Sequence, residues 1–227
     1  MRTLLLSIVF GLAGVSCLAQ GLRLGMAFSP QVSTLRIDNS DYGPDDPTRV
    51  VQEALKGGYS YGLLCEIPLS PAGRYSLSTG LMVSHTGTSI RHERQAETEG
   101  YGQSVSRKMS LQYLEVPVAI KLRAVQIGYV SVIGKFGVVP GVNIRARGEE
   151  VVITEQFTET FTNKKITDIF PVNIGMFLLG GIELSLGENT ALTGGLFLNN
   201  GLTDLINDKD GEKIILNNLG LQVGLLF

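Results

Sequence analysis

The sequence predicts an all-β fold: an eight-stranded antiparallel up-and-down β-barrel that spans a membrane. Residues 216–227 alternate between apolar and small or polar types, and a repeat of two residues is typical of a β-strand. One fully apolar face and one polar face suit a strand between lipid and a polar barrel interior. The 28 glycines and the absence of Trp fit a chain rich in strands and tight turns. The apolar face of this last strand carries Leu219, Leu221, Val223, Leu225 and Phe227.

Four strands are predicted in the first part of the chain, each with aliphatic or aromatic residues on one face and small or charged residues on the other. The fourth is the clearest, because Leu114, Val116 and Val118 alternate with inward-facing residues. Strands of roughly 9 to 11 residues are long enough to cross the hydrocarbon core. The four segments span residues 22–37, 59–69, 74–83 and 111–123.

Four more strands follow from the same alternation, at residues 129–145, 172–186, 191–200 and 216–227. Three prolines fall inside predicted strands, where a missing N–H donor interrupts the ladder. We expect bulges to accommodate Pro68, Pro117 and Pro140.

The connections between these segments predict the topology. Those after the second, fourth and sixth strands are short, whereas those after the first, third, fifth and seventh are longer and polar. Short periplasmic turns and long extracellular loops are typical of bacterial outer-membrane barrels, and both termini then lie in the periplasm. The last strand must pair with the first to close such a barrel.

The first long loop is predicted to contain a helix over residues 45–58. Asp45-Asp46-Pro47 offers an N-cap with Pro at the first helical position, and Gly57-Gly58 would end the helix. The favoured interpretation is a helix packed on the barrel rim, and the alternative is a helix that docks a partner.

The N-terminus predicts export from the cytoplasm. Met1-Arg2 is positive, residues 4–18 are apolar or small, and residues 17–19 fit a signal-peptide cleavage site before Gln20. The domains are therefore a signal peptide at 1–19 and a barrel at 20–227. Lipidation of Cys17 is the alternative. After cleavage Cys65 is the remaining cysteine, which excludes an intramolecular disulfide.

Composition argues against other classes of protein. The net charge of −2 disfavours a nucleic-acid partner. A soluble eight-stranded carrier such as a lipocalin would need an apolar inside and a polar outside. Here the glycines and small residues lie on the face that suits a narrow interior, so we expect the apolar face to meet lipid.

Charged residues on the inward faces predict a barrel plugged by salt bridges. Eight strands leave an interior just wide enough for side chains to fill, and charges buried there must be paired. An ion-conducting lumen is the alternative. The predicted interior network comprises Arg23, Glu66, Glu115, Lys121, Arg123, Lys135, Arg145 and Glu183.

We predict no enzymatic activity and no cofactor or metal. The two histidines are His85 and His92, and His92 beside Glu93 could act as a general base. No recognisable nucleophile motif or phosphate-binding loop accompanies them. The acidic run at 208–212 falls far short of a complete calcium loop, and a hydrophilic turn explains it.

Residues 111–123 read Leu-Gln-Tyr-Leu-Glu-Val-Pro-Val-Ala-Ile-Lys-Leu-Arg. This segment resembles the middle strand of the PorT-like outer-membrane barrel family of Bacteroidetes, as do residues 200–204 and the ending at 220–227. The resemblance implies an outer-membrane barrel and a link to the type IX protein secretion system.

Together these observations predict an integral outer-membrane protein that acts as a structural or interaction subunit. The alternative is a narrow, porin-like passive channel for small solutes. The expected partners are outer-membrane lipid, other outer-membrane or secretion-system proteins at loops 38–58 and 147–167, and the barrel-assembly machinery. The assembly signal that this machinery would read comprises Leu221, Val223, Leu225 and Phe227.

Overall fold

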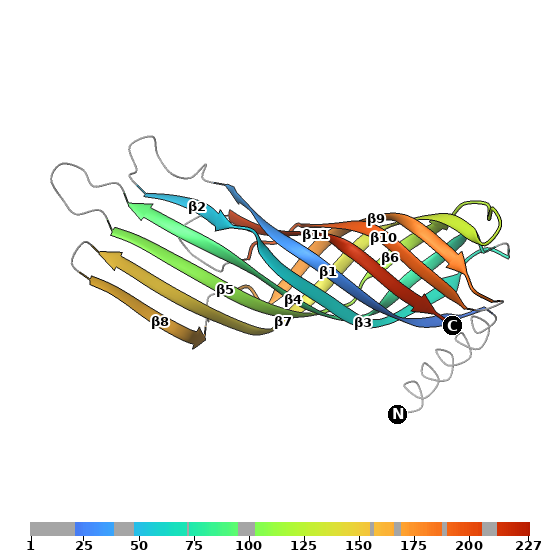
Figure 1. The fold of residues 1–227 in the computed structure, drawn as a ribbon, viewed down its shortest axis with the longest axis horizontal. Helices are drawn as coiled ribbons and strands as arrows, with labels where there is room; N and C mark the ends of the chain where they lie inside the picture. The colour runs from blue at the N-terminus through green and yellow to red at the C-terminus, as the bar shows by residue number, and fades with distance from the viewer. Residues whose placement is uncertain are drawn as a thin grey trace, which may run out of the picture.

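A closed ring of antiparallel strands forms the fold (Figure 1). The computed structural model describes residues 21–38, 48–71, 73–94, 103–154, 157–165, 169–187, 190–205 and 213–227. The strands are β1 (Arg23–Asp38), β2 (Thr48–Ala54), β3 (Lys56–Pro68), β4 (Tyr75–Arg94), β5 (Gln103–Glu115), β6 (Val118–Arg123), β7 (Val130–Thr154), β8 (Phe157–Lys165), β9 (Val172–Ser185), β10 (Ala191–Gly201) and β11 (Lys213–Leu226).

The ring contains eight strand positions, as the sequence predicts. Going round it, β1 pairs with β3, β3 with β4, and β4 with both β5 and β6. β5 and β6 also both pair with β7, so together they occupy one position. From β7 the ring continues through β9, β10 and β11. Every one of these pairings is antiparallel, which confirms the predicted barrel.

The first and last strands close the ring. β11 pairs with β1 from Gly25 opposite Leu226 to Asp38 opposite Lys213. Beyond the strand end, the Leu24 N–H donates to the Phe227 carbonyl at 3.0 Å, and the Phe227 N–H donates to the Leu24 carbonyl at 2.7 Å. The predicted pairing of the C-terminal strand with the first strand is therefore confirmed.

The three prolines are accommodated in different ways. Pro68 ends β3, and Pro117 lies in the short break between β5 and β6. Pro140 stays in register within β7, and its carbonyl accepts from the Val116 N–H at 2.9 Å. The expectation of bulges at the prolines is therefore wrong, because the register is unshifted at all three. The bulge between β5 and β7 lies elsewhere, at Ile144.

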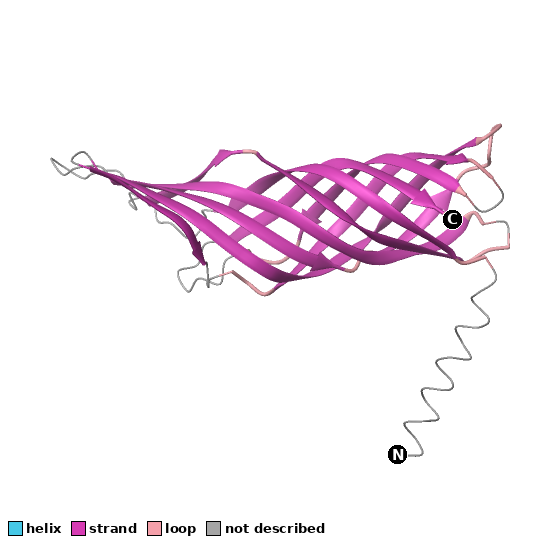
Figure 2. Cartoon of the chain, turned by 60° about the horizontal axis from the view of Figure 1, so that its bottom comes forward, coloured by secondary structure: helices cyan, strands magenta, loops and turns pink. Residues whose placement is uncertain are grey.

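A sheet extension rises from one end of the barrel (Figures 1 and 2). It is formed by the far halves of β4, β5 and β7, with β2 paired to β4 and β8 paired to β7. The short turns after β3, β6 and β9 lie at the opposite end, together with Phe227. Loops 38–58 and 147–167, predicted as partner-binding regions, contribute β2 and β8 to this extension.

The helix predicted at residues 45–58 is not present. Residues 48–54 form strand β2, in which Val50 pairs with His92 of β4, while residues 39–47 lie outside the described chain. Thr48, Val50 and Val51 are β-branched and favour a strand. An available sheet edge on β4 therefore prevails over the helix-capping pattern.

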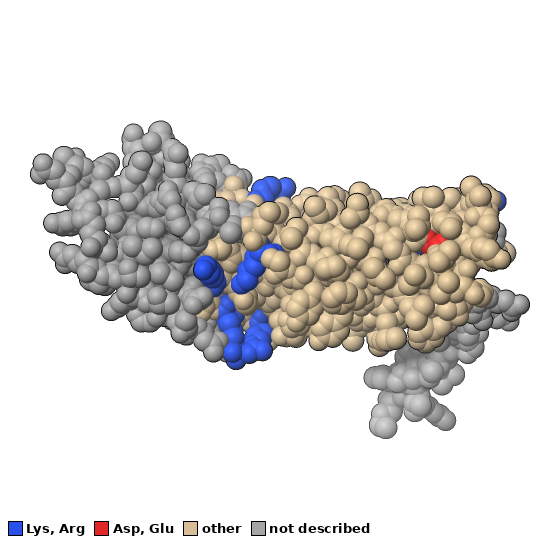
Figure 3. Space-filling view, in the orientation of Figure 1, with Lys and Arg blue, Asp and Glu red and all other residues tan. Residues whose placement is uncertain are grey.

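The outer wall of the barrel is apolar. Side chains such as Phe28, Leu63, Phe136, Leu196 and Leu221 are exposed on it, and Figure 3 shows few charged groups over the barrel wall. The polar groups face inward instead, which is the reverse of a soluble carrier and confirms the predicted orientation of the strand faces. Within the described residues, no helix has the length and apolar character needed to cross a membrane.

Candidate functional site

An ion-pair cluster fills the barrel interior near the short-turn end. Glu66 on β3 and Glu183 on β9 are its two carboxylates, and each side chain is only 1% exposed. Lys121 on β6 lies between them: its Nζ is 2.7 Å from Glu66 Oε2, and it also pairs with Glu183. The lysine therefore bridges two strands that are not neighbours in the ring.

Three further cations complete the cluster. Arg23 on β1 donates to Glu66 at 2.7 Å and to Glu183 at 2.9 Å. Arg123 reaches Glu183 at 3.2 Å, and Lys135 Nζ lies 3.3 Å from Glu66 and 3.2 Å from the Ser78 hydroxyl. Four cations thus surround two carboxylates. We define these residues as the interior cluster: Arg23, Glu66, Lys121, Arg123, Lys135 and Glu183.

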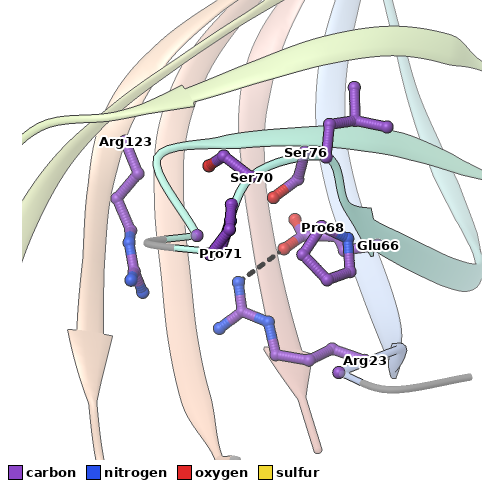
Figure 4. Close-up of a pocket in the computed structure, with 10 residues that line it drawn as sticks. Arg23, Glu66, Pro68, Ser70, Pro71, Ser76 and Arg123 are labelled. Atoms are coloured by element: carbon purple, nitrogen blue, oxygen red, sulfur yellow. Dashed lines mark hydrogen bonds and ion pairs between the residues drawn. The ribbon is translucent and has the colours of Figure 1, made fainter. Parts of the chain in front are cut away.

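The interior cluster is partly open to solvent on one side only. The Arg23 and Arg123 side chains are 22% and 25% exposed, whereas Lys121 and Lys135 are buried. A vestibule of about 500 Å³ at the short-turn end is lined by Arg23, Glu66 and Arg123, which Figure 4 labels. Because each buried carboxylate binds several cations, the desolvated charges are compensated.

A layer of neutral polar side chains lies deeper in the barrel. Gln31 donates to the Ser84 hydroxyl at 3.1 Å, while Ser33 and Thr86 donate to Asn218 Oδ1 at 2.8 and 3.0 Å. These contacts connect β1, β4 and β11 across the interior. Gln31, Ser33, Ser84, Thr86 and Asn218 are all buried.

Glu115 faces the barrel interior, as predicted, but it does not join the interior cluster, so its predicted membership of the charge network is wrong. It lines a separate cavity of about 40 Å³ with Gln31, Asn199 and Gln222. Within the described part of the chain, no cation pairs with its carboxylate. Six residues along the same strand position separate Glu115 from Lys121, which at about 3.3 Å per residue is too far for an ion pair. Gly141 packs against the Glu115 side chain across the β5–β7 pair.

Arg145 is not in the interior at all, and this prediction is also wrong. The register places Tyr113 opposite Asn143 but Gln112 opposite Arg145, so Ile144 is an extra residue in β7. Such a bulge reverses the alternation of faces beyond it. Ile144 and Arg145 are both exposed, while Gly148 further along is buried.

The opposite end of the interior is closed by an apolar cluster that the sequence reasoning missed. Leu205, from the connection after β10, is 4% exposed among side chains of β5 and β11. Thr203 accepts from the Ile174 N–H, and Asp204 accepts from the Ile214 N–H, both at 3.0 Å. The Asn-Gly-Leu-Thr-Asp run at 200–204 is the feature of the sequence that marks this segment. Leu205 packs with Met109, Leu111, Tyr113, Ile214 and Leu216.

His85, the first of the two histidines, belongs to an aromatic group on the outer wall. Its ring lies 4.7 Å from that of Tyr59 and 6.0 Å from that of Tyr61. His92 and Glu93 are in β4, where only their backbone is described. Among the described residues no group of three or more His, Cys, Asp or Glu is placed to hold a metal, and residues 208–212 lie outside them.

The predicted assembly-signal residues share one face of β11. All four are exposed on the outer wall, beside the seam with β1. Their small or polar neighbours Gln222 and Gly224 face the interior. The residues are Leu221, Val223, Leu225 and Phe227.

The match to a family of known proteins agrees with a barrel of the outer membrane. Residues 18–207 match the family described as outer membrane protein beta-barrel domain. Similar solved structures include Neisserial surface protein A (10% identity, 91% of this chain and 97% of that chain, TM-score 0.42). A second is Ail of Yersinia pestis (12% identity, 90% of this chain and 98% of that chain, TM-score 0.36). A third is OprG of Pseudomonas aeruginosa (10% identity, 91% of this chain and 95% of that chain, TM-score 0.42). Among curated proteins, none matches the chain.

Proposed function

Because the chain belongs to the outer membrane protein β-barrel domain family, we propose that it serves the outer membrane as a structural and interaction subunit without catalysis. The observation that carries this proposal is the filled interior. The interior cluster obstructs one end, and the Leu205 cluster covers the other. A barrel with such an interior presents its surfaces to other molecules, and the sheet extension is the part of the described chain that projects beyond the barrel.

We propose that the short turns and both termini lie in the periplasm, so that the extension projects outside the cell. The difference in length between the two sets of connections supports this orientation, since it is typical of bacterial outer-membrane barrels. The extension is formed by β2, β8 and the far parts of β4, β5 and β7. Its edges, β2 and β8, are where backbone N–H and C=O groups would be open to a partner strand.

For the partner we propose a component of type IX protein secretion. The resemblance of residues 111–123, 200–204 and 220–227 to the PorT-like family supports this choice. A deletion strain should then accumulate secreted cargo in the periplasm, and the chain with its extension intact should restore secretion. Normal secretion in the deletion strain would contradict this partner while leaving the outer-membrane barrel unaffected.

Site-specific photo-crosslinking in intact cells tests the interaction role. A photoreactive residue at Val105, in the extension, should capture one defined protein species. The same probe at Tyr129, which is 75% exposed at the short-turn end, serves as the matched control. Absence of a crosslink from any position of the extension, or the same species captured from both ends, would contradict the proposal.

A narrow passive channel is the alternative, and the vestibule of about 500 Å³ favours it. Solutes entering from the short-turn end would meet Arg23 and Arg123 before the buried part of the cluster. For conduction, the bridge from Lys121 to both carboxylates would have to open. Conductance of the purified protein therefore separates the two functions.

A further inference from the structure

Basic side chains gather on the outer wall at the border between the apolar barrel and the sheet extension. Figure 3 shows this band of Lys and Arg beside the apolar surface. Four of its residues are exposed, and we call them the basic belt: Arg36 on β1, Lys108 on β5, and Arg145 and Arg147 on β7.

The alternation of inward and outward side chains along each strand places the residues of the basic belt on the outer face of the barrel. Arg36 has the same parity as the exposed Phe28 and Val32 of β1. Lys108 precedes Met109, which is 1% exposed and lies in the interior, so the lysine faces out. On β7 the bulge at Ile144 brings Arg145 to the outer face. The belt therefore continues the same surface that carries the apolar wall.

The β5 and β7 members lie close together on that surface. Gln112 is opposite Arg145 and Ser110 is opposite Arg147, so the two arginines are two residues apart on one face of β7. Lys108 is two residues before Ser110 on β5, so it lies diagonally across from Arg147. Glu149 is the residue opposite Lys108 in the register. The arginines immediately adjoin exposed Ile144 and Val142, which puts guanidinium groups at the depth where hydrocarbon gives way to headgroups.

The chemistry at that depth identifies the ligand. Guanidinium groups bind phosphate through two parallel hydrogen bonds, and basic residues at a membrane surface are attracted to anionic headgroups. An outer-membrane barrel whose extension points outward places the belt in the outer leaflet. We propose that the basic belt binds the phosphate groups of the outer-leaflet glycolipid. This inference rests on the orientation proposed above, and it requires no protein partner.

Native mass spectrometry of the protein in detergent tests the inference. The probes are a diphosphorylated lipid A and the same glycolipid after enzymatic removal of its phosphates. The wild-type protein should retain the phosphorylated probe and bind the dephosphorylated one at least tenfold more weakly. Single variants R36Q, R145Q and R147Q should each weaken retention by about fivefold, the effect expected for one basic residue near an anionic surface.

The control variant is R74Q, because Arg74 is exposed at the short-turn end. It should retain the glycolipid like the wild type, and each variant is first checked for the compact band that folded barrels give in unheated SDS gels. Equal binding of the two probes, or equal losses in R74Q and R145Q, would overturn the inference. Crosslinking from Val105 should be unchanged in R145Q, so a failure here is distinguishable from a failure of the interaction role.

Discussion

Glu183 contacts more of the interior cluster's cations than a simple ion pair would allow. It accepts from Arg23 at 2.9 Å and Arg123 at 3.2 Å, and it also pairs with Lys121. Its side chain is 1% exposed, so loss of its charge would leave buried cations without compensation. Removing one partner of a buried ion pair lowers protein stability far more than replacing the whole pair with apolar residues does.

We therefore predict that E183Q lowers the free energy of unfolding by about 3–5 kcal/mol. The measurement is urea unfolding of the protein in lipid vesicles. E115Q is the matched control, since Glu115 lines the small cavity and pairs with none of the described cations. A buried carboxylate without a partner is unfavourable, so E115Q should leave stability unchanged or raise it. Equal destabilisation by both variants would contradict this account of the interior.

Residue types alone identified most of the interior cluster but misplaced two members. Alternation correctly indicates that Lys121 and Lys135 face the interior, because each lies in an uninterrupted stretch of strand. It fails at Arg145, where one additional residue reverses the faces. Nothing in the local sequence marks Ile144 as that residue. The bulge arises from pairing between β5 and β7, which one strand's sequence does not encode.

At the scale of elements, the seam between β1 and β11 depends on a glycine. A Cβ at Gly25 would lie 2.2 Å from the Leu225 carbonyl oxygen, closer than real side chains come to a backbone atom. Gly194 on β10 has no atom within 4 Å of its own hypothetical Cβ. The two glycines therefore differ in what a methyl group would meet.

We predict that G25A impairs closure of the ring whereas G194A does not. The quantity to measure is the fraction of protein that migrates as the compact form in an unheated SDS gel after refolding into detergent. G25A should give mostly the extended form, because the added methyl group pushes the last strand away from the first. Normal compaction of G25A would show that the seam is looser than the described register implies.

The segment after β10 provides a second prediction at this scale. Leu205 is 4% exposed in the apolar cluster, while Leu202, three residues earlier, is 51% exposed. L205A should lower the free energy of unfolding by about 2–5 kcal/mol, as expected for a large-to-small change in a packed core. L202A is the control and should have a much smaller effect in the same urea titration. Similar losses for the two variants would argue against a packed closure at this end.

Sequence periodicity predicted the ring strands better than it predicted the extension. The ring strands have one apolar and one small or polar face, and that contrast is the direct result of lying between lipid and a narrow interior. In residues 45–58, the capping pattern and two glycines indicated a helix. The decisive factor was the free edge of β4, with which Thr48–Ala54 pairs. The sequence of residues 45–58 alone contains no information about that edge, because it is formed by a distant strand.

At the scale of the whole molecule, the composition of the interior changes along the barrel axis, and the interior also holds two buried apolar clusters, one around Phe177 and one around Leu64. The interior cluster stands at the short-turn end, neutral polar contacts such as those of Asn218 follow, and the Leu205 cluster lies at the extension end. The outer wall is apolar over the same length, and the basic belt marks where it ends. This arrangement suits a molecule that is anchored in the membrane and acts through its surfaces.

Single-protein conductance in a planar lipid bilayer tests this central claim most directly. The wild-type barrel, inserted at low protein density and with a known porin as the positive control, should give no steady conductance above the bare membrane. Brief, irregular events without a fixed amplitude are compatible with a filled interior. A stable, ion-selective open level in the wild-type protein would contradict the account, because it would require a continuous aqueous path through the interior cluster and past Leu205.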